Sequence, residues 1–219
     1  FWNNPYYLAL GDSFTQGDCV KRSKNLTSNL SKLLKKNVLN LGYGGNGPLI
    51  ELAALVEYSK VTAPKHIIWF FYEGNDVLDF YREKRDSLLI KYLNDENFSQ
   101  NLVNKQPDID NLIRKKSLNV RKNYNTLSKI ITFTDFIKLR KIRSLFHKQN
   151  FLVDDSLLQI FIKGKKISKK LNSKFTVILI PSYERYREQN NNIFRQKKIY
   201  SLDDNIAKLE NMFKKEKIE

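Results

Sequence analysis

Four short apolar runs divide the chain, and a polar turn containing glycine or proline follows each of them. The runs lie at residues 6–11, 38–41, 67–73 and 175–180. Continuous apolar runs of this length are typical of strands buried on both faces of a parallel sheet. The run at 67–73 is the strongest of the four, and we expect it to be central in that sheet.

The segments between the runs carry apolar residues at the spacing of amphipathic helices. Residues 27–29 offer an N-cap for the first helix, Pro48 suits the first turn of the second, and Ser201 caps the last. Strands that alternate with helices in this way build a parallel sheet with helices on both sides. The sequence therefore predicts an α/β fold, with an open and mostly parallel sheet in a three-layer α/β/α arrangement.

Residues 78–172 interrupt this alternation. The segment has no clear strand, many charges and helix-like stretches such as 86–93 and 127–146. A crossover between two parallel strands needs only a short helical connection. We therefore expect residues 78–172 to form a helical insert or lid within a single domain that spans residues 1–219.

The charge balance and the single cysteine narrow the classes of function. Lysine and arginine number 39 against 23 aspartates and glutamates, a net charge of +16. These charges are scattered without a nucleic-acid motif, so we expect no nucleic-acid partner, although they suit an anionic polymer or membrane surface. The only cysteine, Cys19, excludes an internal disulfide and a cysteine-based zinc site, and we expect it to pack in the core. No run approaches the ~18 apolar residues of a transmembrane helix.

Polar turns follow the first three runs, at residues 11–17, 42–47 and 73–76. The carboxyl ends of parallel strands meet at one edge of a sheet, where ligands bind. Ser13, in the tight turn after a buried strand, has the placement of a nucleophile with backbone N–H donors beside it. A glycine of the second turn can bring an N–H close to a substrate, and Asn75 can add a side-chain amide. The alternative for the first turn is a serine that merely caps a helix.

These turns resemble the sequence blocks of the SGNH/GDSL hydrolase superfamily. Residues 11–17 resemble the first block, residues 40–45 the second and residues 74–76 the third. The blocks stand in the order found in that family, each after a predicted strand. Residues 178–181 also resemble the strand that precedes the last block in related cell-envelope proteins.

The resemblance implies a flavodoxin-like fold and a serine ester hydrolase or O-acyl (acetyl) transferase that works through an acyl-serine intermediate. Ser13 matches the nucleophile, Gly45 the oxyanion glycine (or Gly44 if the turn is shifted by one residue), and Asn75 the oxyanion asparagine. The aspartate at position 12 is structural in this family. No cofactor or metal is implied. The substrate class is a small-molecule or carbohydrate ester, which favours the cell envelope or periplasm and leaves the acyl group, the alcohol and the oligomeric state open.

The sequence departs from the family at the fourth block, an Asp-x-x-His that supplies the acid and the base. His66 precedes the third predicted strand, at the wrong edge of the sheet, and His147 lies in the insert without an aspartate three residues before it. We expect both to be structural or surface histidines. Since the chain ends at Glu219, where a further strand should begin, we expect an incomplete sequence rather than a degenerate enzyme. The alternative function is a binding module that keeps the fold without the base.

Overall fold

The computed structural model describes residues 5–116, 153–183, 186 and 193–219. The chain divides into two compact units, one made of Phe1–Gln100 with Phe151–Glu219 and the other of Asn101–Asn150. In the second unit the described part is a 3₁₀ turn at Leu102–Lys105 and a helix over residues 106–116. The predicted helical stretch 127–146 and His147 lie outside the described residues.

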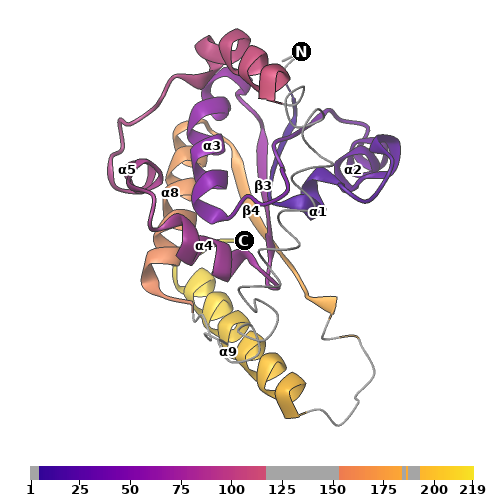
Figure 1. Ribbon diagram of the computed structural model, residues 1–219, viewed down its shortest axis with the longest axis vertical. Coiled ribbons are helices and arrows are strands. Elements are labelled where there is room, and N and C mark those ends of the chain that lie inside the picture. The colour runs from indigo at the N-terminus through magenta and orange to yellow at the C-terminus, as the bar shows by residue number, and fades with distance from the viewer. Residues whose placement is uncertain (1–4, 117–152, 184–185, 187–192) are drawn as a thin grey trace, which may run out of the picture. The chain divides into compact units, whose positions relative to one another are not determined.

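The first unit is built on a sheet of parallel strands in the order β2-β1-β3-β4 (Figure 1). The strands are β1 (Tyr7–Leu10), β2 (Val38–Asn40), β3 (His66–Tyr72) and β4 (Lys174–Ile180). Each lies within one or two residues of the run that predicted it, and β3 is central, between β1 and β4. The predicted α/β fold with a parallel sheet is confirmed. The carboxyl ends of β2, β1 and β3 are consecutive along one edge.

Helices cover both faces of this sheet. They are α1 (Ser13–Gln16), α2 (Leu26–Leu34), α3 (Pro48–Thr62), α4 (Asp76–Glu83), α5 (Ser87–Asn94), α8 (Asp155–Lys170) and α9 (Ile193–Lys215), with a 3₁₀ turn at Arg22–Lys24. Side chains alternate along the strands, so that Leu8 and Leu10 join the cluster packed by α3, α8 and α9. Ala9 and Phe70 point to the other face, where α2 packs. Figure 1 shows α3 and α8 on one side of β3 and β4, with α1 and α2 on the other.

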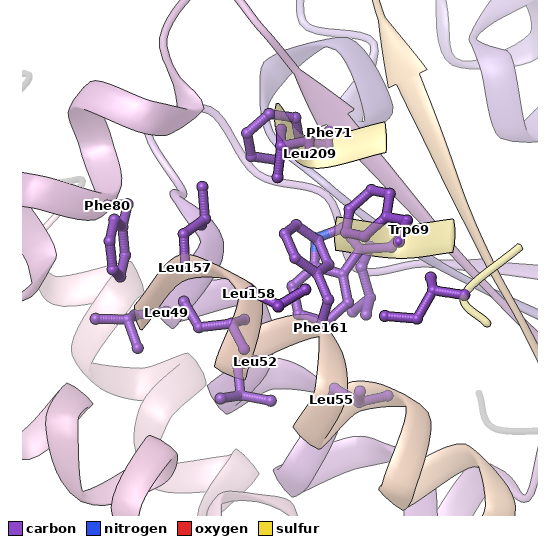
Figure 2. Close-up of a cluster of buried hydrophobic side chains, with 14 of the residues drawn as sticks. Leu49, Leu52, Leu55, Trp69, Phe71, Phe80, Leu157, Leu158, Phe161 and Leu209 are labelled. Carbon is purple, nitrogen blue, oxygen red and sulfur yellow. The ribbon is translucent and has the colours of Figure 1, made fainter. Parts of the chain in front are cut away.

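In the larger cluster, shown in Figure 2, aromatic rings of β3, α8 and α9 pack against one another. Phe161 of α8 lies edge-on to Trp69 and Phe71 of β3, with ring centroids 5.2 and 5.7 Å apart. Its centroid is also 5.0 Å from that of Phe213 in α9. The indole of Trp69 donates a hydrogen bond to the buried Glu51 of α3. Helix α8 falls within the predicted insert, yet it belongs to the core that supports the sheet.

Three local details differ from the sequence prediction. Helix α2 starts two residues early, because the side chain of Asn25 accepts the Ser28 N–H at 2.8 Å and acts as its N-cap. Helix α9 starts at Ile193 rather than at Ser201, since no proline or glycine interrupts residues 193–200. The prediction for Cys19 is wrong: it is exposed, because α1 ends after one turn and the following loop lies at the surface.

None of the described helices combines the length and the apolar character that crossing a membrane requires.

Candidate active site

Ser13 lies at the first position of α1, directly after β1. Its neighbour Asp12 is the N-cap of this helix, and the Asp12 Oδ1 accepts the Phe14 N–H at 2.8 Å. The Ser13 hydroxyl is not part of that cap, and its own bond to Asp12 Oδ2 is long, at 3.5 Å. Asp12 is buried, which raises the pKa of its carboxyl group. The cap thus falls to Asp12 and leaves the half-buried Ser13 for other chemistry.

The second turn packs closely on α1. The Asn40 amide donates to the Thr15 carbonyl at 2.6 Å, and a Cβ added at Gly42 would lie only 2.6 Å from the Thr15 Cβ. The Gly44 N–H donates to the Gln16 Oε1 at 2.6 Å. A Cβ added at Gly44 would lie 3.7 Å from the Ser13 Cβ. The chain therefore brings this turn directly against the serine.

Gly44 and Gly45, the two alternatives for the oxyanion glycine, differ in how their amides are used. The Gly44 N–H is already engaged by Gln16, whereas Gly45 has no acceptor among the described residues. Gly45 adopts a φ of 88°, a conformation that favours glycine, and a Cβ there would meet nothing within 4 Å. This geometry favours Gly45 over Gly44 as the donor.

The third turn places Asn75 at the N-cap of α4. Its Nδ2 donates to the Asp79 Oδ2 at 2.7 Å, and its Oδ1 is buried without a partner. The next residue, Asp76, is fully buried and accepts the Tyr72 N–H at 2.7 Å. The Tyr72 ring contacts that of Phe14, with centroids 4.4 Å apart. The first and third turns therefore lie side by side.

Six buried carboxyl groups lie on α3, α4 and the first turn, namely Asp12, Glu51, Glu57, Asp76, Asp79 and Glu83. Burial raises the pKa of Glu51 and Asp76 well above the ordinary range, and their negative neighbours add to the shift. Burial also raises the pKa of Glu83 to about 7. Glu51, Asp79 and Glu83 are not among the site residues that the sequence predicts. A signal was present, because Glu51 interrupts an otherwise apolar stretch of α3.

These carboxyl groups do not form a metal centre. The part of the chain that the structure describes holds no group of three or more histidine, cysteine, aspartate or glutamate side chains arranged to bind a metal ion.

From the sequence alone, Glu73, directly after β3, could be either a substrate contact or a solvated carboxylate. The side chain is only 4% exposed, and its Oε1 accepts the N–H of the buried Ser182 at 2.5 Å. Glu73 thus fastens the chain after β4 to the third turn.

Neither histidine lies beside Ser13 in the part of the chain that the structure describes. His66 is the first residue of β3, paired with Tyr7 and Lys174 at the amino edge of the sheet. At ~3.3 Å per residue, the strand separates it from the three turns by about 20 Å. Its Nε2 lies 2.9 Å from the Thr176 Oγ1, and burial lowers its pKa. His147 lies outside the described residues, so no imidazole stands beside Ser13 in the described part.

No model of a known protein family matches the chain, and the search of curated proteins finds no match. Among solved structures, AlinE4, described as an SGNH-hydrolase family esterase, matches at 15% identity and a TM-score of 0.33, covering 95% of this chain and 98% of that chain. A point variant of AlinE4 matches at 14% identity with the same TM-score, covering 94% and 96%. Likeness at this identity and TM-score assigns no activity to the chain. The candidate site rests on the geometry of this chain alone.

Proposed function

We propose that the protein is a serine ester hydrolase or acyltransferase of the SGNH/GDSL type, with Ser13 as its nucleophile. The observation that supports this most is the meeting of three turns at one sheet edge. The turns that carry Ser13, Gly45 and Asn75 follow the neighbouring strands β1, β2 and β3. Ligands of parallel sheets bind at this carboxyl edge.

In the proposed reaction the Ser13 Oγ attacks the carbonyl carbon of an ester and passes its proton to a base. The carbonyl oxygen becomes an oxyanion, which accepts hydrogen bonds from the Gly45 N–H and the Asn75 Nδ2. When the intermediate collapses, the C–O bond to the alcohol breaks, the alcohol takes up the proton, and acyl-Ser13 remains. Water or a second alcohol then attacks the acyl group and releases the serine.

The substrate in this proposal is a small-molecule or carbohydrate ester, bound without a metal or cofactor. The net charge of +16 favours an anionic substrate or surface, such as a membrane or the cell envelope. The base is the part of the triad that the described residues do not supply. For that reason a second candidate is a binding module that holds acyl ligands at the same edge without turning them over.

A fluorophosphonate probe tests the proposed nucleophile, with imidazole added to the buffer as a base. We expect a covalent adduct at Ser13, located by mass spectrometry, and its loss in Ser13→Ala. Ser87 is a matched control within the chain: it begins α5 just as Ser13 begins α1, after an aspartate whose Oδ1 accepts an N–H at 2.8 Å. Equal labelling of Ser13 and Ser87, or none at Ser13, would contradict the serine hydrolase and favour the binding module.

A further inference from the structure

Asn75 does not use its side chain as an asparagine at a helix start usually does. At an N-cap the side-chain oxygen normally accepts an N–H of the first turn, a bond that typically stabilises the helix. In α4 that bond is absent: the Asn75 Oδ1 is buried without a partner, and the Nδ2 donates to Asp79 instead. An N-cap side chain that does not make its usual capping hydrogen bond is expected at functional or strained sites.

Asp79 is held so that it can fix the Asn75 amide. It lies one helical turn after Asn75, is 9% exposed, and accepts the Asn75 Nδ2 with Oδ2 at 2.7 Å. Its other oxygen accepts the Arg82 Nη1, also at 2.7 Å. From the second turn, Gly47 packs against it, since a Cβ added at Gly47 would lie 2.8 Å from the Asp79 Cβ. Asp79 is therefore restrained from its own helix and from the neighbouring loop.

We propose that Asp79 is the positioning residue of the oxyanion site, an inference that rests on the proposed function. A primary amide has two N–H groups. Asp79 takes one of them and so fixes the plane of the Asn75 amide, which leaves the second N–H for the oxyanion. Arg82 has a separate part in this arrangement: its guanidinium balances the Asp79 carboxylate, whose charge would otherwise oppose a developing oxyanion.

The test is the rate at which the fluorophosphonate modifies Ser13 in the full 219-residue chain, with imidazole as the base. In this step the Ser13 Oγ–P bond forms, the P–F bond breaks, fluoride leaves, and the serine proton passes to imidazole. The phosphoryl oxygen then needs the same donors as an ester oxyanion. Loss of a donor at such a site costs on the order of 10²–10³ in rate, which is our expectation for Asn75→Ala.

The variants of Asp79 distinguish positioning from a general structural role. We expect Asp79→Ala to slow the modification about tenfold, less than loss of the donor itself. Asp79→Asn should recover most of that loss, because its amide oxygen can still accept the Asn75 N–H. In the Asn75→Ala background, Asp79→Ala should have no further effect, since a residue that acts only through another shows no independent contribution.

Three controls complete the test. Arg82→Ala should slow the modification by a few-fold, as expected for a largely exposed ion pair, while the neighbouring Arg85→Ala should not. Asp86→Ala removes the helix cap of α5 and should leave the rate unchanged. Thermal unfolding of each variant separates slower chemistry from loss of the fold.

Modification of Asp79→Ala at the wild-type rate, or equal effects of that change with and without Asn75, overturns the inference alone. Absence of any adduct on Ser13 in the wild type overturns the proposed function with it.

Discussion

Two glycines of the second turn are needed for opposite physical reasons. Gly42 is where the turn touches α1, and a Cβ there would lie 2.6 Å from the Thr15 Cβ and 2.7 Å from the Gln16 backbone nitrogen. Gly45 faces open space but has a φ of 88°, a backbone conformation that side chains rarely adopt. Glycine is required at position 42 by close packing and at position 45 by the backbone conformation.

This difference predicts the effects of alanine at the two positions. Gly42→Ala forces a packed contact apart and should lower the free energy of unfolding by about 1–3 kcal/mol. Gly45→Ala adds strain only, and should cost about 1 kcal/mol. Urea unfolding of both variants measures the two values. A Gly42→Ala variant as stable as the wild type would show that the second turn does not pack on α1 as described.

Residue patterns predicted the places of the candidate site better than its contacts. The polar turns of Ser13, Gly45 and Asn75 each follow a strand as expected, because a strand and the turn after it are local features of sequence. The partner of Asn75 comes from the next turn of α4, and no periodic pattern marks Asp79 as different from other helical aspartates. The same limit explains Glu73, whose burial depends on the chain beyond β4.

At the scale of elements, the carboxyl group of Glu83 in α4 links that helix to the start of α3 through hydrogen bonds. Helix α3 begins with Gly47 and Pro48, neither of which has a side chain that can cap it. Glu83, at the end of α4, supplies the cap from a distance. Its two oxygens accept the Gly47 and Leu49 N–H groups at 2.7 and 2.8 Å. The positive end of α3 favours the ionised form, but burial is the larger effect and raises the pKa of Glu83 to about 7.

The raised pKa predicts how stability depends on pH. An unfolded glutamate titrates near 4.5, and folded Glu83 near 7, so the folded state binds more protons between these values. Its contribution is complete below pH 4.5 and is lost as the pH rises through 7, a loss of about 3 kcal/mol. Glu51 and Asp76, whose pKa values are also raised, act in the same direction. The urea midpoint should therefore be lower at pH 8 than at pH 5.

A matched variant separates Glu83 from the other carboxyl groups. Glu83→Gln cannot titrate, so its urea midpoint should change less between pH 5 and pH 8. It should also be less stable than the wild type at pH 5, since its amide nitrogen would face an N–H donor of α3. A wild-type protein that gains stability from pH 5 to pH 8 would contradict the assignment.

Strands were predicted more closely than helix ends, and the reason is physical. Strands buried on both faces need continuous apolar runs, so the ends of each run indicate the ends of the strand. A helix start depends on which of several side chains reaches the free N–H groups. For α2 that side chain is Asn25, and for α3 it is Glu83, 35 residues after the proline that begins the helix. A long-range cap of this kind leaves no local signal.

At the scale of the whole molecule, the chain leaves the first unit and then returns to complete its core. Residues Asn101–Asn150 form the second unit, and α8 follows with Phe161 packed on Trp69 and Phe71. The predicted insert of 78–172 thus contains both core helices and the separate unit. That the insert acts as a lid stays a prediction, because residues 117–152 are not among those described.

The base of the proposed triad must come from a part of the chain outside the three turns, because none of the turns contains a histidine. The family pattern expects an Asp-x-x-His, and neither His66 nor His147 stands in one. A serine without its base keeps its oxyanion site but is not activated, and loss of triad members costs on the order of 10⁴–10⁶ in turnover. We expect the 219-residue chain to hydrolyse a small activated ester near the background rate.

Histidine variants locate the base. Without imidazole, the fluorophosphonate should modify Ser13 in the His66→Ala and His147→Ala variants as slowly as it does in the wild type. His66 lies at the opposite edge of the sheet, and we place the base outside the insert that holds His147. Added imidazole should raise all three rates in proportion to its concentration, and Ser13→Ala should stay unmodified throughout. The contrary result is equally clear: a wild type that is fast without imidazole, and a His147→Ala variant that is slow, would place the base in the insert. In that case the predicted insert would contribute a catalytic residue rather than only a lid.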